Sequence, residues 1–357
     1  MDTIAFMSRR LPVSLVFVLA TCSLAWGEDA APDCKAGDKE CIQRVIVASP
    51  AKKIDFWRSS FDKPLAQRVG PAPPEIVRLL TLDNLYHGYP ERPRVSIVKD
   101  DMRADVIAAL EAIPEPVKRR LGDRLAGILF VDDFGGTGFT DSIIDDHGRK
   151  TKAFVVLDPG VLEKRTANAW ATWKENTPFK PDGHHQLAAT IEKPADDTRR
   201  QAIQYILLHE LGHVLAAGGP FHPDWNLAIS AIPDERYPFF DLSWSVDRRN
   251  NVYASRFDAE LPERKSVVYY FGAKLDAASM ATVYEHLERT NFPTLYSATH
   301  PGDDFAESFA SYVHGVMMGK PFEIVISNDG HVVKRYGSCW NEERCAGKRR
   351  ILEEFLR

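Results

Sequence analysis

The residues best suited to chemistry are His209, Glu210 and His213, which stand inside the apolar stretch 203–219. Residues four apart lie on one face of an α-helix, so the two imidazoles can present ring nitrogens to a single metal ion. The glutamate between them projects beside that ion, where a carboxylate can accept a proton from water. A pair of glycines and a proline follow, which predicts that a helix carries these residues and ends just after them.

The spacing is HExxH, the pattern in which two histidines hold zinc and the glutamate is the general base of a metalloprotease. Catalytic zinc sites use three protein ligands and a water, so a third ligand is required. We expect it at Glu307, in the predicted helix 301–319, because a carboxylate among apolar neighbours is costly unless paired or bound to a cation. His222 and Asp224, which follow the first motif closely, are the alternatives.

HELGH on one helix and a later glutamate in DDFAESFA resemble the gluzincin-type zincins, and the FAESFA form is similar to the anthrax lethal factor and Pro-Pro endopeptidase group. The resemblance implies one zinc ion per chain, held by His209, His213 and Glu307. It also implies that Glu210 is the general base and that the fold around the motif is zincin-like.

The resembled family has a tyrosine that stabilises the transition state seven residues before its glutamate ligand. In this chain that position is His300, and Tyr296 stands four residues earlier. Both side chains can donate a hydrogen bond to an oxyanion, so both are candidates for this role. Asp303 and Asp304, one turn before Glu307, are candidate hydrogen-bond partners of the zinc-binding histidines.

Residues 1–27 have the order of a secretory signal, with Arg9 and Arg10, an apolar run, and small residues before a cleavage site after Gly27. The apolar run is too short for a permanent membrane anchor. A lipoprotein signal with a lipidated Cys22 is the alternative. No later segment is predicted to span a membrane. We therefore expect an exported protein, either periplasmic or secreted.

Cysteine use agrees with export, because the remaining four cysteines form a close pair near each end of the chain. Local pairing of Cys34 with Cys41 and of Cys339 with Cys345 is the simplest of three possible connectivities. The formal net charge of −5 argues against general nucleic-acid binding.

The elements that must position the motif predict an α+β fold. We expect a mainly helical N-terminal region at 28–125 and a zincin-like metallopeptidase domain at 126–357. Residues 154–157 could form either a sheet edge that pairs with a peptide substrate or a central buried strand. The predicted helices are 41–47, 74–86, 100–113, 117–125, 279–289 and 349–356, the predicted strands are 127–131, 152–158 and 266–271, a hairpin joins 322–327 to 331–335, and 170–198 is a predicted loop.

These features together predict an exported zinc-dependent metalloendopeptidase that acts on protein or peptide substrates. A zincin-like module that binds without catalysis is one alternative, although the intact Glu210 counts against it. A structural envelope protein that acts through its N-terminal helices is the other.

Overall fold

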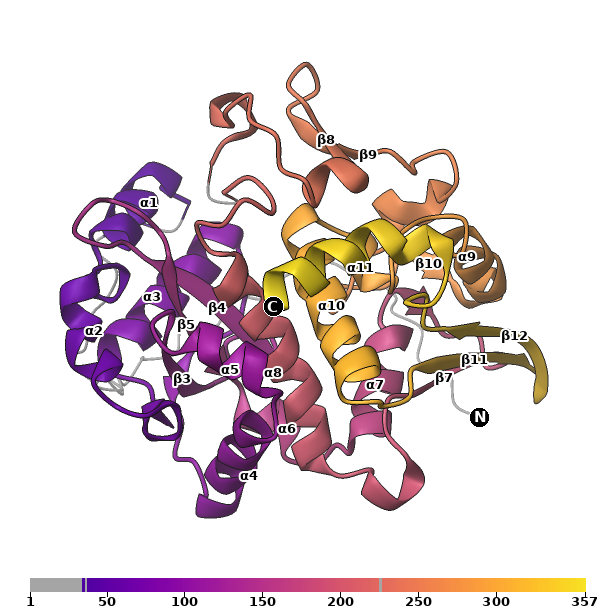
Figure 1. Ribbon diagram of the computed structural model, residues 1–357, viewed down its shortest axis with the longest axis horizontal. Coiled ribbons are helices and arrows are strands. Elements are labelled where there is room, and N and C mark those ends of the chain that lie inside the picture. Colours follow the sequence, from indigo (N-terminus) through magenta and orange to yellow (C-terminus); the bar gives the residue numbers. More distant parts are fainter. Residues whose placement is uncertain (1–33, 36, 225–226) are drawn as a thin grey trace, which may run out of the picture.

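The computed structural model describes residues 34–35, 37–224 and 227–357. Helices and strands mix along this part of the chain, as Figure 1 shows, so the predicted α+β class is confirmed. The predicted signal segment and Cys22 lie outside the described residues. Within the described ranges, no helix is both long and apolar enough to cross a membrane.

The largest sheet has the strand order β1-β3-β5-β4, and β2 pairs with β3 on the side of this path. The strands β1, β3 and β5 are parallel, and β4 runs antiparallel to β5 at the edge. The apolar run of β5 is therefore a central buried strand, and β4 is the edge strand that the sequence did not reveal. The bounds are Val69–Pro71 (β1), Arg94–Val95 (β2), Leu125–Asp132 (β3), Gly138–Ile143 (β4) and Lys152–Leu157 (β5).

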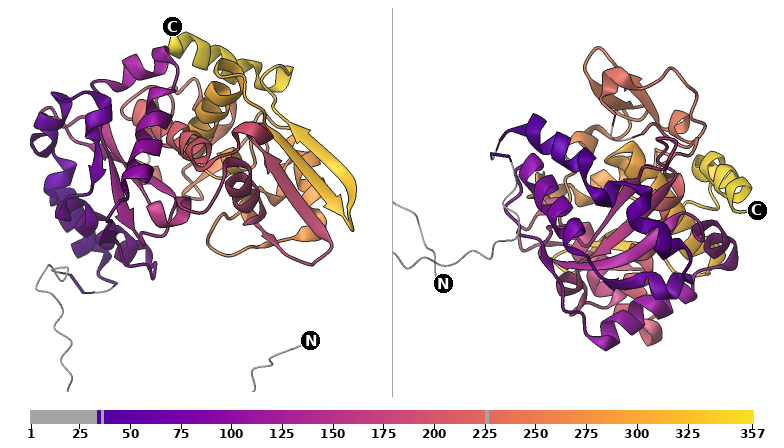
Figure 2. Two further views of the ribbon diagram at one scale, coloured as in Figure 1. Left: turned by 90° about the horizontal axis from the view of Figure 1, so that it is seen from below. Right: turned by 90° about the vertical axis from the view of Figure 1, so that its left-hand side faces the viewer.

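Helices cover both faces of this sheet because side chains alternate along its strands. Leu129 and Val131 of β3 face the helices α2 and α3, whereas Ile128 and Phe130 face α4, α5 and α8. Figure 2 (right) shows the N-terminal helices in front of the strands. The helix bounds are Lys39–Ala48 (α1), Ile54–Phe61 (α2), Pro74–His87 (α3), Asp100–Glu111 (α4), Glu115–Leu121 (α5) and Arg199–Ala216 (α8).

The N-terminal region is not separated from the rest at residue 125. The strand β1, from the N-terminal side of that position, pairs in parallel with β3, which begins at Leu125. The predicted helices at 41–47, 74–86, 100–113 and 117–125 are all present, with their ends shifted by a few residues.

The C-terminal half surrounds a smaller sheet of order β12-β11-β7. The predicted hairpin is confirmed as β11 and β12, and Figure 2 (left) shows it at the opposite end from the N-terminal helices. The remaining elements are Pro159–Leu162 (α6), Ala167–Asn176 (α7), Phe179–Lys180 (β6), His185–Thr190 (β7), Trp244–Asp247 (β8), Val252–Ser255 (β9), Leu275–Asp276 (β10), Met280–Leu287 (α9), Pro301–Tyr312 (α10), Glu323–Asn328 (β11), His331–Gly337 (β12) and Glu343–Leu356 (α11).

Two local predictions are wrong. Residues 170–198 are not a loop, because they contain most of α7 and all of β7. The strand β7 has a polar sequence, and β11 pairs with its backbone. Residues 266–271 are not a strand, because the chain turns there and Tyr270 has a φ of 66°. That left-handed backbone conformation cannot continue an extended strand.

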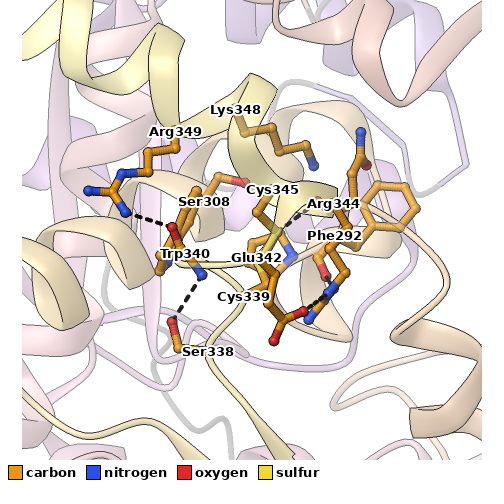
Figure 3. Close-up of a disulfide and its surroundings, with 12 residues drawn as sticks. Phe292, Ser308, Ser338, Cys339, Trp340, Glu342, Arg344, Cys345, Lys348 and Arg349 are labelled. Atoms are coloured by element: carbon orange, nitrogen blue, oxygen red, sulfur yellow. Dashed lines mark hydrogen bonds and ion pairs between the residues drawn. A yellow bond between two sulfur atoms is a disulfide. The ribbon is translucent and has the colours of Figure 1, made fainter.

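The C-terminal helix α11 is fixed to α10 by a buried ion pair between Lys348 and Asp304, both fully buried. The disulfide Cys339–Cys345 closes the turn into α11, and Figure 3 shows it beside Lys348. The other predicted pair, Cys34 with Cys41, is also bonded. Both predicted disulfide pairings are thus confirmed.

The helices α8 and α10 cross so closely that their backbones are in contact. A Cβ atom at Gly212 of α8 would lie 2.8 Å from the Cα atom of Ala306 on α10. Such a distance is too short for an ordinary contact between carbon atoms. Only glycine at this position allows the two helices to approach so closely.

We predict that Gly212→Ala destabilises the protein by about 1–3 kcal/mol, because the added methyl forces the helices apart. In an open helix the same change would be stabilising. Gly122→Ala is the matched control, because Gly122 has a helical backbone and no close neighbour except Arg119. Thermal unfolding of both variants measures the difference in stability. A Gly212→Ala variant as stable as the wild type would contradict the close contact of the two helices.

Candidate functional site

The predicted helix carries HExxH as α8, and both histidines face the start of α10. The Nε2 atoms of His209 and His213 lie 3.2 Å apart. Their rings are nearly perpendicular, with centroids 4.9 Å apart. Two ring nitrogens at this distance repel each other through their lone pairs unless a proton or a cation lies between them.

Asp303, in the first turn of α10, completes the group. Its Oδ1 atom lies 3.6 Å from Nε2 of His213 and 3.9 Å from Nε2 of His209. Tetrahedral zinc bonds of about 2.0–2.1 Å place ligand atoms roughly 3.3 Å apart, which is close to these separations. Among the described residues, these three form the group whose ligand atoms are close enough together to hold a metal ion.

Glu307 lies behind His209 rather than in that group. Its Oε1 atom is 3.1 Å from Nδ1 of His209 and 3.0 Å from Nζ of Lys174. Its other oxygen accepts a hydrogen bond of 3.0 Å from Thr294. Glu307 therefore has the contact with a histidine that the sequence predicted for Asp303 and Asp304, whereas Asp303 lies beside the Nε2 atoms of both histidines.

Asp303 and Glu307 share one face of α10 because they are four residues apart. The one nearer the helix start reaches the Nε2 side of the two rings, and the other reaches the Nδ1 side of His209. Asp304, the other predicted partner of the histidines, points away from them. It accepts hydrogen bonds from Trp244 and Ser308 and pairs with Lys348 of α11.

The electrostatics of the group favour ionised carboxylates. Burial works against the charge of Glu307, but Lys174 and His209 outweigh it and lower its pKa to about 2. Burial also opposes the charge of Asp303, yet the nearby histidines hold its pKa below the ordinary value. For His209, the facing carboxylates outweigh the effect of burial and raise the pKa.

Glu210, the predicted general base, is held against the edge strand β4. Its Oε2 atom accepts a hydrogen bond of 2.6 Å from the Thr140 hydroxyl. Gly138 makes room for it, because a Cβ atom there would lie 2.4 Å from Oε1 of Glu210. The sequence did not indicate a role for Thr140 or Gly138. The glycines in GGTGFT were the available signal.

The two candidates for oxyanion stabilisation occupy different positions. The ring of Tyr296 has its centroid 5.5 Å from that of His209. His300 instead caps α10, with its Nδ1 atom accepting a bond of 3.2 Å from the N–H of Gly302. Burial lowers the pKa of His300 and raises that of Tyr296, so both are neutral near pH 7.

The alternative ligands His222 and Asp224 lie outside the group. His222 donates from Nδ1 to the carbonyl of Pro223, and burial lowers its pKa to about 4. Asp224 pairs with Lys150 at 2.7 Å. Both line a separate cavity that contains neither His209 nor His213.

Two cavities meet at His209, Glu210 and Tyr296. One is about 200 Å³ and mostly lined by aromatic and aliphatic side chains, among them Phe134, Trp170, Ile206, Tyr270 and Phe271. The other is about 550 Å³ and more polar, and α1 and α3 line it through Gln43, Ile46, Asp83, Tyr86 and His87. The N-terminal helices are therefore a wall of the site.

Comparison of the chain with protein-family models, with curated proteins and with solved structures found no match. The functional assignment accordingly depends on the residues and geometry of the site itself.

Proposed function

We propose that the protein is an exported zinc-dependent metallopeptidase that hydrolyses peptide bonds. The observation that carries the proposal is the convergence of His209, His213 and Asp303 beside a carboxylate, Glu210, that is free of a salt-bridge partner within the described residues. A helix with this motif next to the edge of a mixed sheet also supports a zincin-like fold. The two disulfides support an oxidising compartment and hence export.

Asp303 replaces Glu307 as the third ligand in this proposal. The change also alters the spacing to the tyrosine, because Tyr296 stands seven residues before Asp303. That is the spacing between tyrosine and ligand in the resembled gluzincin-type family. A shift of about one helical turn thus accounts for both departures from the family pattern, the aspartate ligand and the histidine at position 300.

The reaction follows from the positions of these side chains. A zinc ion at the site would supply a Lewis acid that polarises the scissile carbonyl and lowers the pKa of a water. Glu210 accepts the proton of the attacking water and passes it to the leaving amine. Thr140 holds one oxygen of Glu210 in place. The phenol of Tyr296 donates a hydrogen bond to the oxygen on which negative charge develops.

The substrate that fits this arrangement is an extended peptide. The strand β4 is an edge strand that passes directly beside Glu210, and an extended chain can pair with such an edge through main-chain hydrogen bonds. The two cavities lie on either side of the catalytic residues. Side chains on the two sides of the cleaved bond would therefore meet different surroundings.

We predict about one zinc ion per chain, and none in His213→Ala or Asp303→Ala. Glu307→Gln should keep zinc with an affinity about 10–100-fold lower, because it keeps an acceptor behind His209 but loses the charge. Metal analysis and chelator competition measure this. Zinc binding by Asp303→Ala together with loss in Glu307→Gln would return the ligand role to Glu307, and wild-type protein without zinc would end the proposal.

We predict that Glu210→Gln keeps zinc but loses peptide hydrolysis by several orders of magnitude. Gly138→Ala should lower kcat about a hundredfold, because its methyl displaces the Glu210 carboxylate by an ångström or more. Gly70→Ala is the control, since a Cβ atom there meets nothing within 4 Å. Turnover of a peptide library tests all three. Zinc binding with no turnover by wild-type protein would favour the non-catalytic binding module.

We predict that Tyr296→Phe lowers kcat by roughly a hundredfold or more with little change in KM, as loss of an oxyanion donor costs about 2.7–4 kcal/mol. His300→Ala should mainly lower stability by about 1 kcal/mol, because it removes a helix cap. Steady-state kinetics and thermal unfolding separate these effects. The opposite ranking would assign the donor role to His300, the other candidate that the sequence offers.

A further inference from the structure

Lys174 of α7 is a buried cation that the proposed reaction does not use. Its side chain is 5% exposed, and it lines the smaller cavity together with His209 and Glu210. A buried ammonium group is costly unless it is paired. Its Nζ atom lies 3.0 Å from Oε1 of Glu307 and 3.5 Å from Oε1 of Glu175.

Through Glu307, Lys174 is linked to His209 of the histidine pair. The oxygen that Lys174 binds is the same one that lies 3.1 Å from Nδ1 of His209. The buried Nδ1 atom of His209 makes no well-aligned hydrogen bond, so its close contact with Glu307 is electrostatic. Lys174 and Thr294 hold the carboxylate from two other sides, so its position limits the orientation of the His209 ring.

Lys174 also contacts the tyrosine of the site. Its Nζ atom lies 4.7 Å from the ring centroid of Tyr296, within the range of a cation–π interaction. The same ammonium group therefore touches the residue behind His209 and the proposed oxyanion donor. No other lysine or arginine among the described residues lines the cavity in which these side chains meet.

Glu175 is the second carboxylate in this cluster, but it faces away from the histidines. Its Oε2 atom accepts hydrogen bonds from Tyr269 at 2.8 Å and Tyr284 at 2.9 Å. These bonds hold Glu175 independently of Lys174. A substitution of Glu175 can therefore disturb the cluster without removing the contact between Lys174 and Glu307.

We propose that Lys174 is a positioning residue that fixes His209 through Glu307 and Tyr296 through its ring, and so sets both metal affinity and turnover. The proposal rests on the proposed zinc site. It predicts that the two properties fall together when the ammonium group is removed, whereas a purely structural ion pair would affect stability alone.

The test compares Lys174→Met with the matched control Glu175→Gln, which disturbs the same cluster but leaves Glu307 paired. We expect Lys174→Met to bind zinc about 10–100-fold more weakly than wild type, as found when partners of metal ligands are lost. Its kcat for a cleaved peptide should fall at least tenfold with KM within about twofold. Glu175→Gln should stay within a few-fold of wild type in both, although both variants unfold at lower temperature.

Removal of Lys174 leaves the buried carboxylates of Glu175 and Glu307 without the cation that both contact, so Lys174→Met could fail to fold. The double variant Lys174→Met/Glu175→Gln removes one positive and one negative charge and keeps the cluster near balance. It should show the same weakened zinc binding, with an altered visible absorption spectrum when Co²⁺ replaces zinc. Circular dichroism establishes that each variant is folded.

Wild-type zinc affinity in either folded variant that lacks Lys174 would overturn the inference, and so would an equal loss in Glu175→Gln. Zinc affinity is measured without a substrate, so this outcome is distinct from failure of the proposed function. Wild-type protein that binds zinc but cleaves no peptide would remove the hydrolytic function and leave the test of Lys174 intact.

Discussion

The close crossing of α8 and α10 is the constraint on which the rest of the site depends. Gly212, between the two histidines in the sequence, lets the backbone of α8 touch that of α10 at Ala306. At this separation the carboxylates on α10 reach the imidazoles of α8 directly. A wider crossing would leave Asp303 and Glu307 out of reach of the rings, and water would fill the space between the helices.

The helical repeat directs the acidic side chains of α10 towards different neighbouring helices. Asp303 and Glu307 point towards α8, whereas Asp304, about 100° further around the helix, points towards α11 and pairs with Lys348. Burial, together with the positive charge of Arg344, lowers the pKa of that lysine to about 8 despite its partner. Breaking a buried pair of this kind costs about 3–5 kcal/mol. The pair therefore holds α10 in a fixed position against α11.

The sequence could predict features set by neighbouring residues, and it could not predict contacts set by how the helices pack in the folded protein. The i, i+4 spacing of His209 and His213 fixed their common face, and the Asn-Asp-Gly turn fixed the hairpin. The sequence did not show which carboxylate would face the Nε2 atoms, because Asp303 and Glu307 lie on one face of α10. An apolar setting identifies a buried carboxylate without saying which end of an imidazole it meets. The edge strand β4 was missed because short polar strands with glycine lack a clear period of two.

The charge around His209 gives an independent reason to expect a cation at the site. The carboxylates of Glu210, Asp303 and Glu307 all act to raise the pKa of His209, and Lys174 pairs with Glu307. Without a metal, a proton on the imidazole supplies part of the missing positive charge. A divalent cation would supply more, and it would displace that proton from the ring, because ligand histidines must be neutral. Metal binding should therefore weaken as the pH falls through the raised pKa of His209. The proton and the metal compete for the imidazole of His209.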